Sequence, residues 1–308
     1  MNFLAFVARR GRWVLPTGLA IGVAAPGLAR AMEPLIVPIL AALLFLAALR
    51  IGPGAVAAAR VQLPRTLALT AALQVVPPLV AVALFTGFGV ADNILAIGVV
   101  LVLAASPITG LPGLVVLSGA DPAPALRQLV IGTALLPLTV LPVLAVLPVF
   151  ESPGAVILGA LRLMAIILLA GAGGMWLRSR LPRLARPEGV QAVDALTALG
   201  MGLLVIALTS AIGPALLSAD PMLWAVLALV TVLNFASQAA CFVAVRSAGG
   251  NAPALAIAAG NRNLALFLAA LPPATAQEML LFVGCYQVPM FLTPILLAPL
   301  YRRASDSG

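Results

Sequence analysis

The sequence predicts an all-α membrane protein with ten transmembrane helices, arranged as two inverted repeats of five helices. Apolar residues make up 63% of the chain, charged residues make up 8%, and the mean hydropathy is +1.18. A soluble domain of 308 residues would carry far more charge on its surface. The apolar stretches are long enough to cross a hydrocarbon core about 30 Å thick, and they lack the alternation of barrel strands. Helices are then the structure that satisfies every backbone group inside lipid.

Composition also argues against several classes of function. The net charge of +8 comes from arginine without lysine, in short loops and without interleaved aromatic residues, so no nucleic-acid partner is expected. The chain has no histidine, and its two cysteines, Cys241 and Cys285, lie in apolar segments as small packing residues do. We therefore expect no metal site, no cofactor and no enzymatic activity.

Ten apolar segments lie between charged residues and turn signals, and each is interpreted as one crossing. The approximate segments are Trp13–Leu28, Pro34–Leu49, Thr66–Phe88, Asn93–Ser118, Pro124–Phe150, Gly154–Leu177, Ala195–Ile212, Met222–Val245, Ala252–Leu271 and Gln277–Tyr301. The fourth and the ninth of these are interrupted by helix-breaking residues.

Arginine placement sets the orientation, because cytoplasmic loops are enriched in basic residues. With ten crossings, fourteen arginines fall on the side of the N-terminus and only Arg30 falls on the other side. The fourteen are Arg9, Arg10, Arg12, Arg50, Arg60, Arg65, Arg127, Arg178, Arg180, Arg183, Arg186, Arg246, Arg302 and Arg303. The opposite loops contain Glu33, Asp92, Glu151, Asp220 and Glu278. Both termini are therefore expected in the cytoplasm, with the chain in a bacterial inner membrane.

An alternative concerns the N-terminal segment. Arg9–Arg12, the apolar stretch and Ala29-Arg30-Ala31 resemble a secretory signal peptide with its small-residue cleavage site. Cleavage at this position would leave nine helices and remove the symmetry between the two halves.

The two interrupted segments occupy the same place, fourth, in each half of the chain. One contains Ser106–Gly113, with Pro107 and Pro112, and the other contains Gly260–Asn263. An odd number of crossings per half inverts the second half relative to the first, and transporters of this kind bind substrate where paired broken helices meet. We expect the two breaks to cross near the midplane, where helix N-termini would attract an anion.

Arg262 is the most informative residue, because an arginine inside an apolar segment is costly unless it has a partner or a function. No acidic residue is expected at comparable depth, which also argues against proton antiport by a carboxylate pair. Two roles stay open: pairing with carbonyls freed at the breaks, or bidentate pairing with a substrate carboxylate. Arg162, in the sixth segment, is expected to extend toward the headgroups instead.

At these residues the chain resembles the bile acid:sodium symporter superfamily, its bacterial members in particular. The matching residues are Ser106-Pro107 through Ser118-Gly119-Ala120-Asp121, Gly260 through Leu266, and Gln74 followed by Pro77. The resemblance implies a panel subdomain at about 13–50 and 154–212 and a core subdomain at about 66–150 and 222–301. It also implies alternating access between them, with bile-acid-like or smaller organic anions as substrates.

The chain departs from this family where sodium would bind. Ala256 and Gly260 stand in place of a glutamate and a glutamine, and Leu111-Pro112 in place of a Ser-Asn pair. These residues offer no side-chain oxygen, so transport is expected to be independent of sodium, with the fixed charge of Arg262 in the place of the ion. A symporter that uses residual ligands is the alternative.

The candidate residues form two sets. For substrate binding they are Arg262, Asn261, Asn263, Thr109, Gly110, Pro112 and Gly113. For an ion site or a polar core they are Gln74, Gly260, Thr133, Asn234, Gln238 and Gln287. The expected function is a secondary transporter of small organic anions; the alternatives are a receptor or scaffold that does not transport, or another type of ten-helix exporter.

Overall fold

The computed structural model describes residues 14, 16–60, 62–247 and 251–306. This part of the chain is 84% helical and contains no strand, which confirms the all-α class. Arg9, Arg10, Arg12 and the start of the first expected segment lie outside the described residues, as does most of the basic part of the signal-like pattern. Residues 16–24 are helical.

Among the described residues, six helices are long and apolar enough to cross a membrane, and a bent pair raises the number to seven. The six are Pro26–Gly52, Leu63–Gly87, Pro122–Val146, Pro153–Arg180, Pro187–Leu208 and Pro221–Ser247, and the bent pair is Leu280–Leu296 with Ala298–Ala304. The chain is thus of the multi-pass membrane type. Ten crossings and the inverted repeat stay predictions.

The structure differs from the predicted segments near Arg30. The first two segments were expected to be separated by a loop at Arg30–Glu33, but this stretch lies inside the single span Pro26–Gly52. Pro34 does not end the span, because it lies in the first turn of the 3-10 helix Glu33–Leu35, where its missing N–H is tolerated.

The described chain divides into two compact units. Unit 1 comprises residues 1–58 and 164–224, and unit 2 comprises residues 59–163 and 225–308. In unit 1, α2 packs on α11, and Arg50 and Asp194 form an exposed ion pair at 2.7 Å. Its elements are α2 (Pro26–Met32), η1 (Glu33–Leu35), most of α3 (Ile36–Ala59), the second part of α10 (Pro153–Arg180), η2 (Pro182–Ala185), α11 (Pro187–Leu208) and α12 (Ile212–Leu217).

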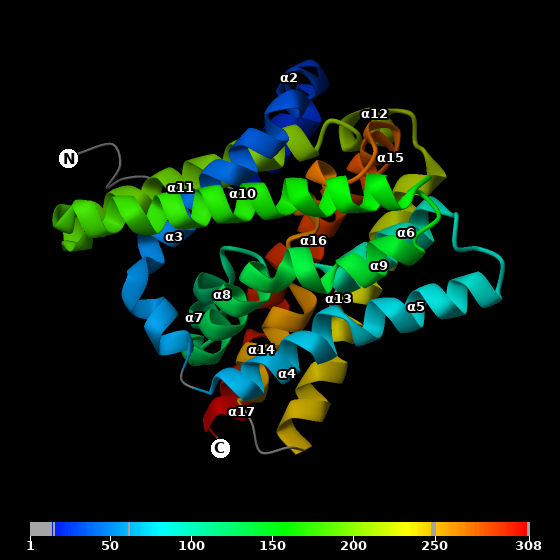
Figure 1. Ribbon diagram of the computed structural model, residues 1–308. Helices are drawn as coiled ribbons and strands as arrows, with labels where there is room; N and C mark the ends of the chain where they lie inside the picture. Colours follow the sequence, from blue (N-terminus) through cyan, green and yellow to red (C-terminus); the bar gives the residue numbers. More distant parts are fainter. Residues whose placement is uncertain (1–13, 15, 61, 248–250, 307–308) are drawn as a thin grey trace. The chain divides into compact units, whose positions relative to one another are not determined.

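Unit 2 contains both interrupted segments. Its α4 and α5 form one kinked rod, and α8 packs against α4, α7 and α14 (Figure 1). The elements are α4 (Leu63–Gln74), α5 (Val76–Gly87), α6 (Ile94–Ala104), α7 (Leu111–Leu117), α8 (Pro122–Thr139), α9 (Leu141–Val146), the start of α10, nearly all of α13 (Pro221–Ser247), α14 (Ala252–Gly260), η3 (Leu264–Ala269), α15 (Pro273–Glu278), α16 (Leu280–Leu296) and α17 (Ala298–Asp306).

Side-chain caps start three helices of unit 2 where the sequence places Asn or Asp before an apolar run. Asn93 accepts a hydrogen bond from the Leu95 N–H at 2.8 Å and begins α6. Asp121 and Asn251 cap α8 and α14 in the same way. Each cap satisfies a backbone donor that the helix itself leaves free.

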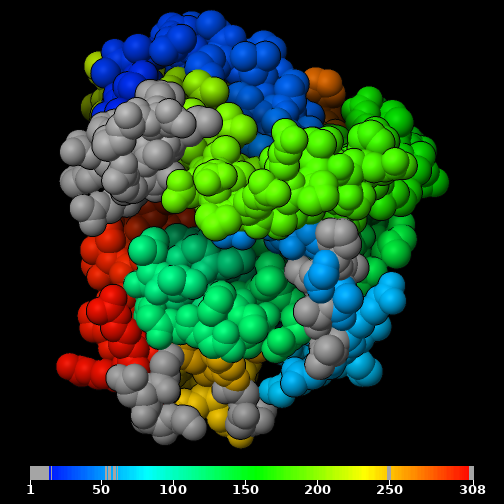
Figure 2. Space-filling view, turned by 90° about the vertical axis from the view of Figure 1, so that its left-hand side faces the viewer, coloured from blue at the N-terminus to red at the C-terminus, as the bar shows by residue number. Residues whose placement is uncertain are grey.

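The C-terminal helix of unit 2 lies beside α7, as the red and blue-green surfaces in Figure 2 show. Arg302 of α17 donates to the Leu117 carbonyl at 3.5 Å. Its side chain also crosses Gly119, whose positive φ of 78° ends the turn after α7; a Cβ there would lie 2.5 Å from Arg302 Cγ. Glycine is therefore required at this turn both for its backbone conformation and for space.

Large apolar side chains are exposed along the helices of both units. Phe88 is 77% exposed, Leu169 is 75% exposed and Leu217 is 80% exposed. In water such exposure is unfavourable and leads to association, whereas lipid tails accommodate it. The surface therefore agrees with the membrane class.

Gly98 of α6 tests the packing inside unit 2, because a Cβ at this position would lie 2.5 Å from the ring of Phe282 on α16. We expect Gly98→Ala to lower the thermal unfolding midpoint in detergent, by about 1–3 kcal/mol in unfolding free energy, since the buried ring must shift. Gly87→Ala is the control, because nothing lies within 4 Å of a Cβ there. A Gly98→Ala midpoint equal to that of the parent would contradict this packing.

Candidate functional site at the paired helix breaks

The interrupted segments are broken where the sequence indicates. Helix α6 ends at Ala104, and Ala105 is extended, with φ −64° and ψ 149°. Pro107 lacks an N–H and disfavours the helical conformation of the residue before it, so the helix cannot continue through Ser106. The chain resumes as α7 at Leu111. In the other segment, α14 ends at Gly260, and residues 261–263 separate it from η3.

The two breaks pair with each other through their backbones. Pro107 and Arg262 form an isolated antiparallel bridge. The Ile108 N–H donates to the Asn261 carbonyl at 2.9 Å, and the Asn263 N–H donates to the Ser106 carbonyl at 2.8 Å. Each break thus satisfies backbone groups that the other leaves free, as irregular backbone within a membrane protein requires.

Arg262 is buried between three helix ends, with 3% of its surface exposed. Its Nε donates to the Ala259 carbonyl at 2.7 Å, its Nη1 to the Ala105 carbonyl at 2.8 Å and its Nη2 to the Leu73 carbonyl at 3.3 Å. These carbonyls belong to the C-terminal ends of α14, α6 and α4. A cation is favoured there, because the C-terminus of a helix carries partial negative charge.

Arg262 itself meets three C-terminal helix ends. The attraction of an anion by the helix N-termini that follow the two breaks stays a prediction. Of the two roles left open for Arg262, the hydrogen bonds favour internal pairing with freed carbonyls. Direct pairing with a substrate carboxylate stays a prediction.

A polar network encloses Gly260 on the side of α13 and α16. Asn234 Nδ2 and Tyr286 Oη both donate to the Gly260 carbonyl. Gln238 Nε2 donates to Asn234 Oδ1 at 2.7 Å. A Cβ on Gly260 would lie 2.3 Å from Gln238 Cγ and 2.6 Å from the Asn234 carbonyl oxygen, so only glycine fits.

The network closes through two residues that the sequence analysis missed. Gln238 Nε2 also donates to Thr293 Oγ1 at 2.9 Å, and Tyr301 Oη donates to Gln238 Oε1 at 2.9 Å. Thr293 Oγ1 lies 3.4 Å from Asn261 Oδ1, which links the network to the break. The chain has two tyrosines, and both bond here; that scarcity in apolar segments was the available signal.

Polar side chains of α4, α8 and the first break include four buried atoms without a partner among the described residues. These atoms are Gln74 Nε2, Ser106 Oγ, Gln128 Oε1 and Thr133 Oγ1. Gly132 makes room for the group, because a Cβ there would lie 2.6 Å from Gln74 Nε2. A buried polar atom without a partner costs about 1–3 kcal/mol, so such a group marks a place where water or a ligand supplies the missing bonds.

The predicted residues are therefore brought together only in part. Gly260 and Asn261 join Asn234 and Gln238 in one hydrogen-bond network, and Arg262 and Asn263 lie in the same break. Gln74 on α4 and Thr133 on α8 each carry a buried atom without a partner among the described residues. Thr109, Gly110 and Pro112 are half-buried after the first break, and Gly113 is exposed. Gln287 donates to the Val283 carbonyl of its own helix. Gln128 was not among the predicted residues.

Comparison with known proteins adds no relative: the sequence matches no protein-family model and no curated protein. The resemblance to the bile acid:sodium symporter superfamily therefore rests on the sequence motifs alone.

The buried guanidinium is open to a stability test. We expect Arg262→Ala to lower the thermal unfolding midpoint in detergent, because the Leu73, Ala105 and Ala259 carbonyls lose their donor. Each unsatisfied carbonyl costs about 1–3 kcal/mol of unfolding free energy.

Arg162→Ala is the matched control, because Arg162 lies exposed on α10 and its removal changes the unfolding free energy by about 0.5 kcal/mol or less. If both variants unfold at the temperature of the parent, Arg262 does not hold the breaks together.

Proposed function

We propose that the chain is a secondary transporter of small organic anions that works by alternating access without sodium. The observation that carries the proposal is the pairing of two broken helices around a buried guanidinium whose hydrogen-bond acceptors are carbonyls. Membrane transporters bind substrates where discontinuous helices meet, and a buried cation favours an anionic substrate. Bile-acid-like molecules or carboxylate metabolites are the proposed substrate class, following the resemblance.

Transport without sodium is supported by the hydrogen bonds that the carbonyl oxygens at the breaks already accept from protein donors. A bound alkali cation needs several oxygen ligands. The Gly260, Ala105 and Ala259 carbonyls instead accept hydrogen bonds from protein donors. Ala256, in place of the family's glutamate, is buried and offers no side-chain oxygen. In this proposal the guanidinium takes over the role of the ion and draws the breaks together.

Two buried donors without a partner, one on α4 and one on α8, are the proposed contacts of the substrate carboxylate. Gln74 Nε2 and Thr133 Oγ1 carry hydrogen-bond donors without acceptors, and Gln74 follows Leu73, whose carbonyl binds Arg262. Because the dielectric constant is low inside the protein, the positive charge of Arg262 is proposed to attract a carboxylate that is bound by these donors. Both atoms are sealed from solvent in this conformation, so substrate entry requires the site to open, as alternating access demands.

Thr133→Val separates function from stability. Valine removes a hydroxyl that has no partner, so the unfolding midpoint is expected to stay equal or rise, while the uptake of substrate into proteoliposomes falls about tenfold. Uptake is measured with a panel of radiolabelled organic acids.

Thr231→Val is the control, because the Thr231 hydroxyl bonds to the Leu227 carbonyl of its own helix and uptake is expected to be unchanged. Anion uptake no faster than in protein-free liposomes, for every acid tested, would overturn the proposal; binding without uptake would indicate a receptor.

A further inference from the structure

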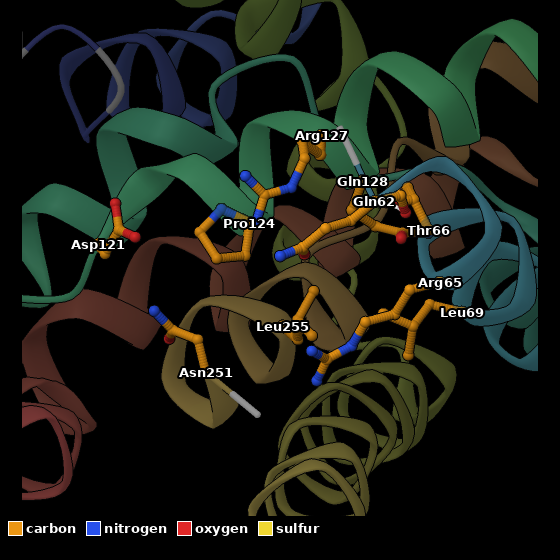
Figure 3. Close-up of a pocket in the computed structure, with 10 residues that line it drawn as sticks. All are labelled: Gln62, Arg65, Thr66, Leu69, Asp121, Pro124, Arg127, Gln128, Asn251 and Leu255. Carbon is orange, nitrogen blue, oxygen red and sulfur yellow. Dashed lines mark hydrogen bonds between the residues drawn. The ribbon is translucent and has the colours of Figure 1, made fainter. Parts of the chain in front are cut away.

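A pocket in unit 2 lies where three helices begin. It has a volume of about 200 Å³ and is lined by Gln62, Asp121 and Asn251, which are the N-cap residues of α4, α8 and α14 (Figure 3). Each of these helices has at least nine residues, and the N-terminus of a helix carries partial positive charge. Three such ends around one hollow favour an anion.

Two arginines strengthen this preference. Arg65 comes from α4 and Arg127 from α8, and both line the pocket, one exposed and one half-buried. Figure 3 shows Asp121 and Asn251 at one end of the hollow, and Arg65 with Thr66 and Leu69 toward the other. The Asp121 carboxylate accepts from the Ala123 N–H as a helix cap. The lining thus has two full positive charges and one negative charge.

Gln128 gives the pocket a buried acceptor. Gln128 is 1% exposed and lines the pocket, and its Oε1 has no partner among the described residues. Its Nε2 is held by Thr70 Oγ1 at 3.0 Å, which fixes the amide. A carbonyl oxygen cannot bond to a bare oxyanion, because both are acceptors. The pocket therefore suits a ligand that carries anionic oxygens together with a hydroxyl.

We propose that this pocket binds a phosphate group with an adjacent hydroxyl, the phosphate on Arg65 and Arg127 and the hydroxyl on Gln128 Oε1. Guanidinium groups bind phosphate oxygens through charge-assisted hydrogen bonds. The volume is below the range of about 300–1,000 Å³ of drug-sized sites, so the ligand is small: hydrogen phosphate, or the headgroup of a glycerol phospholipid. Gln128 also belongs to the polar group described above, but neither arginine is a proposed contact of the transported substrate, and this proposal does not depend on transport.

The binding experiment uses the full chain and reads thermal unfolding, not transport. In detergent, sodium phosphate at pH 7 is expected to raise the unfolding midpoint above sodium chloride of equal ionic strength. In nanodiscs, phosphatidylglycerol mixed into phosphatidylcholine tests the lipid source of the same group. Arg65→Ala and Arg127→Ala are each expected to weaken the response about tenfold in apparent affinity.

Two further variants make the test specific. Arg303→Ala, on the exposed end of α17 and outside the pocket lining, is expected to keep the full response. Gln128→Leu is expected to remove the preference for hydrogen phosphate over sulfate, because sulfate has no hydroxyl at pH 7 and gains nothing from the amide oxygen.

Each outcome decides the proposal. A response in detergent that depends on both arginines identifies a soluble phosphate ligand, and one seen only with phosphatidylglycerol identifies a lipid headgroup. The proposal is overturned if neither phosphate nor phosphatidylglycerol changes the unfolding midpoint, or if the response persists in both arginine variants. It is also overturned if phosphatidylglycerol has no effect and the parent responds to phosphate no more than to sulfate.

Discussion

The backbone bridge between the two helix breaks is the constraint on which the rest of unit 2 depends. Breaking a helix frees N–H and C=O groups, and in a membrane each such group must find a protein partner. Here the breaks at Ser106–Gly110 and Asn261–Asn263 supply partners to each other. The Arg262 guanidinium between them binds the carbonyls of Ala105 and Leu73, which lie 157 and 189 residues away along the chain. The surrounding packing keeps them in register, with glycine at Gly260.

Helix polarity then divides unit 2 into two places of opposite character. At the breaks, the C-terminal ends of α4, α6 and α14 surround one buried cation and stabilise it. At the opposite ends of α4 and α14, together with the start of α8, N-termini and arginines surround a hollow. Between the two places run the Thr66, Thr70 and Gln74 side chains, all buried on α4. Helices α4 and α14 run in the same direction, from the hollow to the breaks, so their N-termini meet at one place and their C-termini at the other.

The sequence predicted the class, the two breaks and the burial of Arg262, because each follows from local chemistry: apolar run length, prolines without N–H groups, and the cost of a charge in lipid. It could not predict which carbonyls Arg262 binds, since Leu73 meets it only after tertiary packing. Thr293 and Tyr301 were missed for the same reason. The loop predicted at Arg30 is absent. Pro34 was interpreted as a helix-breaking residue, but a proline in the first turn of a helix is tolerated.

The guanidinium of Arg262, which is part of the chain, is proposed to make a bound sodium ion unnecessary at the breaks. The most direct test is the thermal unfolding midpoint of the purified chain as sodium chloride replaces choline chloride at constant ionic strength. If Arg262 serves in place of the ion, the midpoint stays constant across the exchange. A saturable rise with sodium, of the form that a ligand bound to the folded state produces, would contradict the account.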